Sequence, residues 1–322
     1  PLASNITTNE TGFGDDVSSI VFEPPPNYPG ISHPGLLEAT TDTSTPATTS
    51  KPTTESTPTN TSTVDEKCKV GIGALGGEGE RTENDRSRFF CGASLITDRH
   101  ILTAAHCVVN PKLVPEVIRL GERDFTTSED CASLDYKVKK VTKHPEYKLL
   151  SSYNDIAVIE LERSVLDESP NLLPYCLPKQ EVDLDGRTCT FSGWGTRPNT
   201  PASTILLNVN VTVRPLEECR EQYNRNSVND VFRVSHPRGL SDGSLCAAGE
   251  DGMDACRGDS GGPLVFMSGS DSAQEVGIVS QGIGCGDPRF PGIYTRVDAY
   301  LDWLDEVVYG EDNDESCPKT EA

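Results

Sequence analysis

The chain has 322 residues, with 28 Lys and Arg against 50 Asp and Glu, which gives a formal net charge of −22. This acidity argues against a nucleic-acid partner, because phosphate binding needs clustered Lys and Arg. No apolar run approaches membrane-spanning length, so no membrane partner is predicted. The negative charge would favour the approach of cationic substrates, although it also fits a role in solubility alone.

Residues 1–67 are poor in large apolar side chains and predict a disordered leader rich in Ser, Thr and Pro. The run from Thr40 to Thr63 cannot bury enough apolar surface to offset the loss of chain entropy on folding. It fits an ordinary flexible linker and a mucin-like glycosylated stalk equally well. The chain begins at Pro1 without a signal peptide, and we expect that such a segment has been removed.

From residue 90 onward, short apolar or alternating runs are separated by turn residues, which predicts an all-β sandwich or barrel and not βαβ units. A C-terminal helix is expected where apolar side chains recur at helical spacing between Val297 and Val308. Residues 311–322 read as a solvated acidic tail. The predicted strands lie in ASLIT, HILTAA, EVIRL, YKVKKVT, DIAVIEL, TCTFSGW, ILLNVNVTV, PLVF, EVGIVS and GIYTRV.

Eleven cysteines, all from Cys68 onward, are too many and too widely spaced for a cytosolic enzyme. No Cys-X-X-Cys pair indicates a zinc site, so an oxidising compartment is the better interpretation. The sequence therefore predicts a secreted, extracellular protein. Its four candidate N-glycosylation sites are Asn5, Asn9, Asn60 and Asn210.

Three segments carry candidate catalytic groups: LTAAHC with His106, NDIAVIEL with Asp155, and GDSGGP with Ser260. A serine hydroxyl is a poor nucleophile unless a base takes its proton, and that base needs an acid to hold its tautomer. The glycines around Ser260 allow the tight turn that an oxyanion hole of backbone N–H groups requires. Gly258 and Ser260 are the predicted donors.

These segments resemble the trypsin-like (chymotrypsin-fold) serine proteases, and within them the invertebrate extracellular cascade proteases that usually carry an N-terminal clip domain. The resemblance covers about Cys68 to Val308. It implies two six-stranded β-barrels in a protease domain at residues 68–310, no cofactor, and an active site between the barrels. No cysteine precedes Cys68, so the clip domain is absent. Other motifs that carry the resemblance are CGASLITDRHILTAAHC, YCLP, SGWG, LCAAGEDGMDACRGDSGGPL, VSQGIGCG and PGIYTRV.

The same resemblance places Asp254 at the base of the primary specificity pocket, with Gly282 and Gly292 leaving the walls open and Ser280 contacting substrate. A carboxylate at the bottom of a narrow pocket needs a cationic partner, which implies Arg or Lys before the scissile bond. Ala255 replaces a serine found in many relatives, and the missing hydroxyl favours Arg over Lys.

The disulfides implied by the resemblance leave three cysteines over. Phe266 stands where many relatives carry the partner of Cys189, so Cys131 with Cys189 is a tentative pair and Cys317 would be free or intermolecular. The implied pairs are Cys91 with Cys107, Cys219 with Cys246, Cys256 with Cys285, and Cys68 with Cys176.

Two further loops depart from, or extend, the family pattern. Glu122, Asp124 and Glu129 lie where some relatives hold Ca²⁺, although a solvated acidic loop is the alternative. Gln281 stands where relatives usually present an aromatic side chain, which alters the wall beside the substrate. The histidines outside the motifs, which are His33, His100, His144 and His236, are expected at the surface or in packing.

Family members are activated by cleavage at a motif like Arg-Ile-Val-Gly-Gly, after which the new amino terminus pairs with the acid before the catalytic serine, here Asp259. The chain lacks that motif and passes from Cys68 straight into KVGIGAL. Either Lys69-Val70 is a degenerate cleavage site, or Val70 to Leu75 is the first barrel strand and the activation segment is missing.

The sequence thus predicts a secreted trypsin-like serine endopeptidase that cleaves proteins after Arg or Lys in an extracellular cascade of clotting, melanisation or immune signalling. The expected partners are a downstream zymogen and serpin-type inhibitors, and the chain is expected to be a monomer. The alternative is a catalytically silent regulatory or binding protein that uses the protease fold as a scaffold.

Overall fold

The computed structural model describes residues 71–77, 79, 85–128, 131–197, 200–225, 230–250, 253–268, 272–287 and 289–310. Several predicted features lie outside these residues. They are the leader 1–67, the tail 311–322, the Lys69-Val70 bond, Cys68, Cys317, His33, Glu129, Asn5, Asn9 and Asn60.

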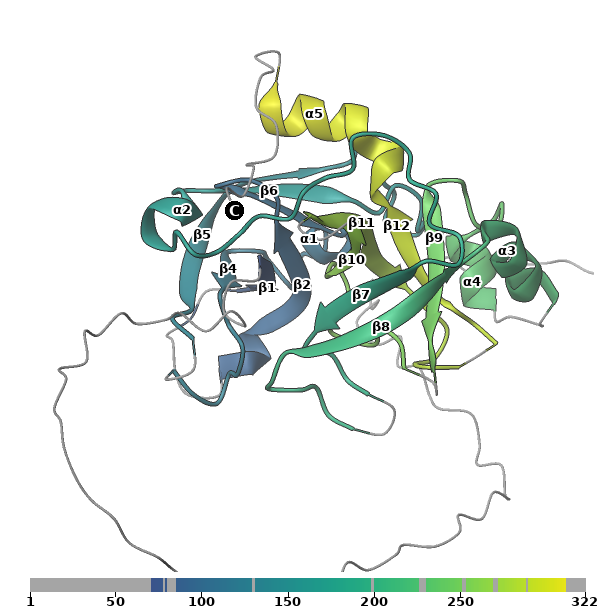
Figure 1. Ribbon diagram of the computed structural model, residues 1–322, viewed down its shortest axis with the longest axis horizontal. Coiled ribbons are helices and arrows are strands. Elements are labelled where there is room, and N and C mark those ends of the chain that lie inside the picture. The colour runs from purple at the N-terminus through teal and green to yellow at the C-terminus, as the bar shows by residue number, and fades with distance from the viewer. Residues whose placement is uncertain are drawn as a thin grey trace, which may run out of the picture. The chain divides into compact units, whose positions relative to one another are not determined.

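The described strands close into two antiparallel six-stranded barrels, as the resemblance implied (Figure 1). The first barrel has the strand order β1-β2-β3-β6-β5-β4. Its core is filled by aliphatic side chains from every strand and by Tyr136. The strands are β1 (Ile72–Gly76), β2 (Phe89–Leu95), β3 (His100–Thr103), β4 (Val117–Leu120), β5 (Leu134–Lys143) and β6 (Ala157–Leu161).

The second barrel has the strand order β10-β11-β12-β9-β8-β7. The period of two is clearest in β8, where Val211 and Val213 are buried and Asn210 and Thr212 are exposed. We did not predict β9, because its small residues (SLCAAG) show no alternation. The strands are β7 (Thr188–Gly193), β8 (Leu207–Arg214), β9 (Ser244–Gly249), β10 (Pro263–Ser268), β11 (Ser272–Gln281) and β12 (Gly292–Arg296).

The expected C-terminal helix is α5 (Leu301–Tyr309), which a 3-10 turn, η4 (Val297–Tyr300), precedes. Val297 and Leu304 are fully buried in the core of the first barrel, and Figure 1 shows α5 beside β6. No described helix is long and apolar enough to cross a membrane. The helices that we did not predict are η2 (Asp85–Arg88), α1 (Ala105–Val108), α2 (Val165–Glu168), α3 (Leu216–Arg225) and α4 (Asp230–Ser235).

The segment IGALG forms the first strand of the first barrel, as one of the two interpretations of KVGIGAL predicted. β1 pairs with β2 on one edge and with β4 on the other, and all five of its residues are buried. A Cβ added at Gly73 would lie 2.9 Å from a Leu120 methyl group and 3.1 Å from one of Ile118. A glycine is therefore needed where β1 crosses the packed face of β4.

The disulfides Cys91–Cys107, Cys219–Cys246 and Cys256–Cys285 are present, in the pairing that the resemblance implied. Cys131 and Cys176 are also disulfide-bonded. The tentative Cys131–Cys189 pair is wrong, because Cys189 is a free thiol. Cys189 is 1% exposed in the core of the second barrel, where Phe266 packs against the same cluster, whereas Cys131 precedes β5 of the first barrel.

A fully buried carboxyl group, that of Glu275, belongs to β11 itself. Glu275 is 0% exposed, and neither of its carboxyl oxygens has a hydrogen-bond partner among the described residues. Ser94 lies nearby, but its hydroxyl donates to the Leu102 carbonyl at 3.3 Å. Burial raises the pKa of Glu275 to about 8, so the folded protein holds this carboxyl protonated at neutral pH.

Glu275 should therefore reduce stability as the pH rises. The unfolded chain releases this proton near pH 4.5 and the folded chain near pH 8, so the free energy of unfolding falls across that interval. Glu275→Gln should remove a slope of up to about 1.4 kcal/mol per pH unit, measured by chemical denaturation between pH 6 and 8. Glu306→Gln, at an exposed position of α5, controls for the lost charge. Equal slopes in the wild type and Glu275→Gln would contradict the assignment.

Candidate active site

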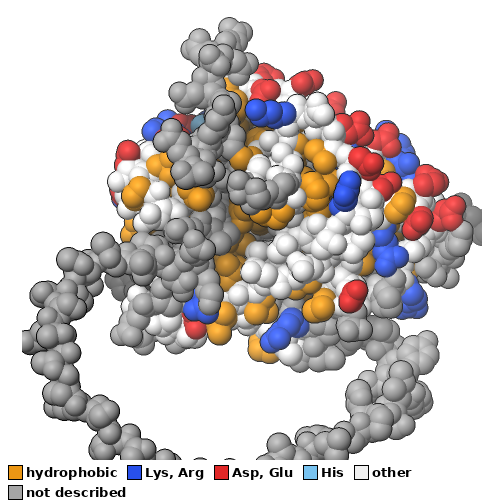
Figure 2. Space-filling model, viewed as in Figure 1, with side chains coloured by type: hydrophobic (Ala, Val, Ile, Leu, Met, Phe, Trp, Pro, Cys, Tyr) orange, Lys and Arg blue, Asp and Glu red, His pale blue; other side chains and the backbone are white. Residues whose placement is uncertain are grey.

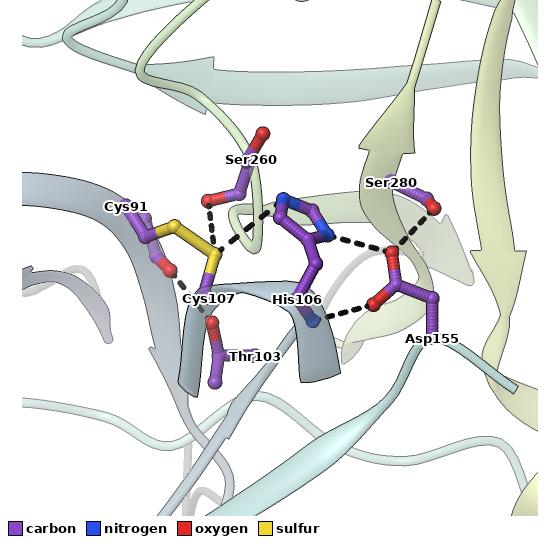
Figure 3. Close-up of a disulfide and its surroundings, with 8 residues drawn as sticks. Cys91, Thr103, His106, Cys107, Asp155, Ser260 and Ser280 are labelled. Carbon is purple, nitrogen blue, oxygen red and sulfur yellow. Dashed lines mark hydrogen bonds and ion pairs between the residues drawn. A yellow bond between two sulfur atoms is a disulfide. The ribbon is translucent and has the colours of Figure 1, made fainter. Parts of the chain in front are cut away.

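The three predicted catalytic residues come from both barrels and lie together. His106 lies in α1, which follows β3, and Asp155 lies just before β6, whereas Ser260 precedes β10 of the second barrel. Figure 3 shows the His106 imidazole between the Asp155 carboxylate and the Cys91–Cys107 disulfide, with Ser260 beside the disulfide. The disulfide holds α1 against β2, so it sets the position of the imidazole relative to the serine loop.

Asp155 receives hydrogen bonds from both barrels. The His106 backbone N–H donates to Oδ1 at 2.8 Å, and His106 Nδ1 lies 2.7 Å from Oδ2. Ser280 Oγ in β11 donates to Oδ2 at 2.6 Å, and Thr295 Oγ1 in β12 donates to the Asp155 carbonyl at 2.9 Å. The preceding residue, Asn154, has a φ of 57°, a left-handed conformation that Asn tolerates better than most residues. The two barrels therefore fix this carboxylate jointly.

The hydrogen bond between His106 and Asp155 sets the protonation of both groups. Burial alone would lower the pKa of His106 and raise the pKa of Asp155. Their opposite charges and mutual hydrogen bonds outweigh burial, so the pKa of His106 is raised and the pKa of Asp155 is lowered. Because an ionised carboxylate only accepts hydrogen bonds, the neutral imidazole carries its proton on Nδ1. His106 Nε2 is then the basic nitrogen.

The loop that carries Ser260 is fixed to the first barrel through its glycines. Gly261 has a φ of 81°, and a Cβ there would lie 2.2 Å from Thr103 Oγ1, so only glycine fits. The Gly92 N–H of β2 donates to the Ser260 carbonyl at 2.8 Å. These contacts explain why the motif continues as Ser-Gly-Gly after the predicted nucleophile.

The backbone N–H groups predicted to form an oxyanion hole are unoccupied by protein acceptors. Within the described part of the chain, neither the Gly258 N–H nor the Ser260 N–H donates a hydrogen bond. The Arg257 carbonyl accepts from the Thr196 N–H at 2.8 Å. Because the peptide is planar and trans, this contact points the Gly258 N–H away from Thr196. Gly258 itself has a φ of 92°.

The predicted base and nucleophile are close but not hydrogen-bonded to each other. The hydroxyl of Ser260 makes no hydrogen bond to any described residue, and His106 Nε2 lies 3.7 Å from Cys107 Sγ. Cys107 Sγ is also 3.6 Å from the Ser260 carbonyl oxygen. Unliganded sites often show such loose geometry, which tightens when substrate binds.

The Asp254 carboxylate is held in position by the groups around it. Its Oδ1 accepts from the Ala255 N–H at 2.7 Å and from the Tyr294 hydroxyl at 3.3 Å. A Cβ at Gly292 would lie 2.7 Å from Oδ1, whereas a Cβ at Gly282 would meet nothing closer than 3.8 Å. Burial raises the pKa of Asp254 to about 6 against these hydrogen bonds. No described Lys or Arg forms an ion pair with it, so its cationic partner is not within this part of the protein.

Gln281 makes a polar bridge between the barrels that the sequence did not predict. Its Oε1 accepts from Ser152 Oγ at 2.5 Å, and its Nε2 lies 3.1 Å from His236 Nδ1 and 3.4 Å from Ser235 Oγ. His236 is buried and stacks on Phe232, and burial lowers its pKa to about 4. A neutral imidazole can accept from the Gln281 amide. The sequence signal that could have indicated this bridge was the polar Gln281 at a position where relatives usually have an aromatic residue.

The predicted activation partner, Asp259, points inward and is 4% exposed. Its Oδ1 accepts from the Gly195 N–H at 2.6 Å and its Oδ2 from the Cys256 N–H at 2.9 Å. A Cβ at Gly193 or Gly195 would lie 2.2 Å from a carboxylate oxygen, so the group packs directly on that backbone. Burial raises the pKa of Asp259 to about 6, and these backbone donors oppose the rise.

The position of β1 bears on how an amino terminus could approach Asp259. Gly92 of β2 lies beside the Asp259 carbonyl, but the Gly71 carbonyl accepts from the Leu95 N–H at 2.7 Å. Leu95 is three residues, or about 10 Å, further along β2 than Gly92. The described start of β1 at Gly71 is therefore displaced along β2 from the Asp259 carbonyl.

Of the weak Ca²⁺ candidates, the structure describes Glu122 and Asp124, and both carboxylates bond to neighbouring protein groups. Glu122 is buried, with Oε2 near Arg119 Nη1 at 3.5 Å and accepting from Ser133 Oγ at 3.0 Å. Asp124 Oδ1 accepts from the N–H and the hydroxyl of Thr126. The described group of His, Cys or acidic atoms close enough to share an ion is Cys91, His106 and Cys107, and its sulfurs form a disulfide. The described residues thus provide no suitable donor set.

Comparison with known proteins agrees with this geometry. The sequence profile of the Trypsin family matches residues 78–304. Phenoloxidase-activating factor 3 of Holotrichia diomphalia is 37% identical over 236 residues, which cover 68% of this chain and 64% of the relative. Proclotting enzyme of Tachypleus tridentatus is 36% identical, with coverages of 67% and 58%. A solved structure of mouse neuropsin, a serine protease, superposes with a TM-score of 0.59 at 28% identity, covering 75% of this chain and 96% of neuropsin.

The profile match spans well over half of the chain, and the chain therefore belongs to the trypsin family of serine proteases. It spans less than two thirds of the length of the two relatives named above.

The His106–Asp155 contact predicts the result of a titration that does not depend on activity. In Asp155→Asn the attraction that raises the pKa of His106 is lost while burial remains, so the pKa should fall from above to below about 6.5. Proton NMR of the imidazole would measure it, with His144, which packs against Tyr300 and Trp303, as an internal control. An unchanged His106 titration would refute the role assigned to this contact.

Proposed function

We propose that this protein is a secreted serine endopeptidase that cleaves protein substrates after Arg, and less readily after Lys. The observation that carries the proposal is the hydrogen-bonded His106–Asp155 pair beside Ser260, with the half-buried carboxylate of Asp254 six residues before the serine. Ser260 and Asp254 lie on the same loop before β10, and His106 and Asp155 face that loop from the first barrel.

The reaction would proceed in two acyl-transfer steps. His106 Nε2 takes the proton of Ser260 Oγ as the oxygen attacks the substrate carbonyl carbon, and Asp155 stabilises the resulting imidazolium. The Gly258 and Ser260 N–H groups bind the oxyanion of the tetrahedral intermediate. His106 then passes its proton to the leaving amine, and a water activated in the same way hydrolyses the acyl-enzyme. No metal or cofactor takes part in this scheme.

Substrate selection would follow from the environment of Asp254. A buried carboxylate that lacks a cation within the described chain is strongly stabilised by the guanidinium of an incoming Arg side chain. Arg spans the pocket and forms paired hydrogen bonds, whereas Lys is a point charge that needs further donors and acceptors. Ala255 offers no hydroxyl to a Lys ammonium, so Arg is the preferred residue.

The wider context is proposed from the relatives and from the surface. Relatives named as a phenoloxidase-activating factor and a proclotting enzyme support a place in an extracellular proteolytic cascade, with a downstream zymogen as substrate and serpin-type inhibitors as regulators. Figure 2 shows acidic side chains gathered over α5 and over the segment before β7. This charge would attract basic cleavage segments. Exposed acidic residues of the two segments are Glu181, Asp183, Asp185, Asp302, Asp305 and Glu306.

A second candidate function is a catalytically silent regulatory protein. The observation that favours it is the Ser260 hydroxyl, which forms no hydrogen bond with His106 Nε2 or with any other described residue. In that case the barrels would serve as a binding scaffold, and the His106–Asp155 contact would be structural.

A panel of peptides separates these candidates. With purified full-length chain, cleavage after Arg should exceed cleavage after Lys by about tenfold, because one missing hydrogen bond to a charged group costs about 1.4 kcal/mol or more, and cleavage after Leu should be negligible. Ser260→Ala measures the background. Asp254→Asn should lower kcat/KM for the Arg peptide by about 10²-fold or more while leaving the Leu peptide unchanged. Hydrolysis that equals the Ser260→Ala background, before and after treatment with an activating protease, would support the silent protein.

A further inference from the structure

The Asp259 carboxylate needs a positive charge, and the described structure offers one from within the chain. A buried carboxylate held only by neutral donors retains a large desolvation penalty. Two backbone N–H groups, of Gly195 and Cys256, satisfy its oxygens without neutralising it. The nearby Asp254 adds a like charge that raises its pKa further. Among the described side chains, Arg86 is the basic one whose charge lowers the pKa of Asp259.

The guanidinium of Arg86 lies beside the backbone that surrounds Asp259. Arg86, in η2, donates through Nη2 to the Trp194 carbonyl at 3.3 Å, and Trp194 directly precedes Gly195. A Cβ on Gly258, the residue before Asp259, would lie 3.4 Å from the same Nη2. Arg86 therefore contacts the chain on both sides of the carboxylate.

Local contacts hold Arg86 in this position. Its Nη1 donates to the Phe89 carbonyl at 2.6 Å, and the guanidinium lies 5.6 Å from the Phe125 ring centroid. The Nε atom is buried without a partner. Burial lowers the pKa of Arg86 and the charge of Asp259 raises it, so each group stabilises the charged form of the other. The described contacts include no direct ion pair between them, and the attraction acts through space.

We propose that Arg86 is a positioning residue that supplies an internal positive charge to Asp259 and so keeps Gly258 and Ser260 in a substrate-binding conformation without a newly cleaved amino terminus. This proposal rests on the proposed function, because it concerns the same oxyanion hole. It fits the described start of β1, where the Gly71 carbonyl binds Leu95 of β2 and not Gly92, the residue that lies beside Asp259. Arg86 acts through Asp259 and does not touch the reacting atoms.

The first test uses protein stability and does not require activity. In Arg86→Gln the pKa of Asp259 should rise by about one unit or more, so the stability deficit relative to wild type should grow between pH 5 and pH 8. Arg86→Lys should restore most of the wild-type profile. In an Asp259→Asn background the Arg86→Gln substitution should have no pH-dependent effect, because the charge that it serves is gone.

Arg88→Gln is the matched control in the same 3-10 turn. Arg88 pairs with Asp85 at 2.7 Å, and this contact lowers the pKa of Asp85. The stability that this pair contributes is present above the unfolded pKa of Asp85, near pH 4, and is lost as the pH falls. The deficit of Arg88→Gln should therefore be flat between pH 5 and pH 8. A flat deficit in Arg86→Gln as well, or one that persists in the Asp259→Asn background, would overturn the proposal.

The second test follows the serine loop with an organophosphonate reagent that labels activated serines. As the pH is lowered, the labelling rate of Ser260 should begin to fall at a pH about one unit higher in Arg86→Gln than in wild type. Arg86→Lys should restore the wild-type pH dependence. Labelling in wild type with no shift in Arg86→Gln would overturn the role of Arg86. If the stability deficit of Arg86→Gln depends on pH as expected but wild-type Ser260 is not labelled, the result would count against the proposed function. The coupling between Arg86 and Asp259 would then still stand.

Discussion

The site depends on one buried carboxylate, Asp155, that belongs to neither barrel alone. Its position is set by the main chain and side chain of His106 in the first barrel and by Ser280 and Thr295 in the second. A carboxylate at 2% exposure is tolerated because three donors, two from His106 and one from Ser280, bind its oxygens. The alignment of the two barrels and the tautomer of the imidazole are therefore consequences of the same set of contacts.

The serine loop obeys a second constraint, which is steric. Gly92, Gly261 and Gly262 allow the loop to approach β2 so closely that a single methyl group would collide with backbone or with Thr103. The Cys91–Cys107 disulfide fixes His106 to the same strand that binds the Ser260 carbonyl. Two adjacent residues of β2, Cys91 and Gly92, thus hold the segments that carry the base and the nucleophile. This explains how residues 154 positions apart in sequence meet within one site.

Much of the fold and of the site could be predicted from sequence where chemistry or periodicity is local. The alternation in β8, the helical period in α5, and the motifs around His106, Asp155 and Ser260 are signals of this kind. β9 was not predicted, because its small residues show no alternation of apolar and polar side chains. Cys189 was paired wrongly, because cysteine spacing does not show that this residue is buried in the second barrel. Two further contacts, of Gln281 with His236 and of Arg86 with Trp194, join segments that are far apart in the chain. No local sequence pattern predicts such contacts.

Three acids, the half-buried Asp254 and the buried Asp259 and Glu275, all have a raised pKa, yet only the first two lie at the site. Asp254 lacks a cation that a substrate would supply, and Asp259 has the internal charge of Arg86. The central claim is that these groups serve one nucleophile. Burst titration with a 4-guanidinobenzoate ester tests it most directly, because acylation needs the cation pocket, the oxyanion hole and Ser260 together. We predict a burst approaching one equivalent that is lost in Ser260→Ala, and the absence of a burst from correctly folded, protease-treated chain would contradict the claim.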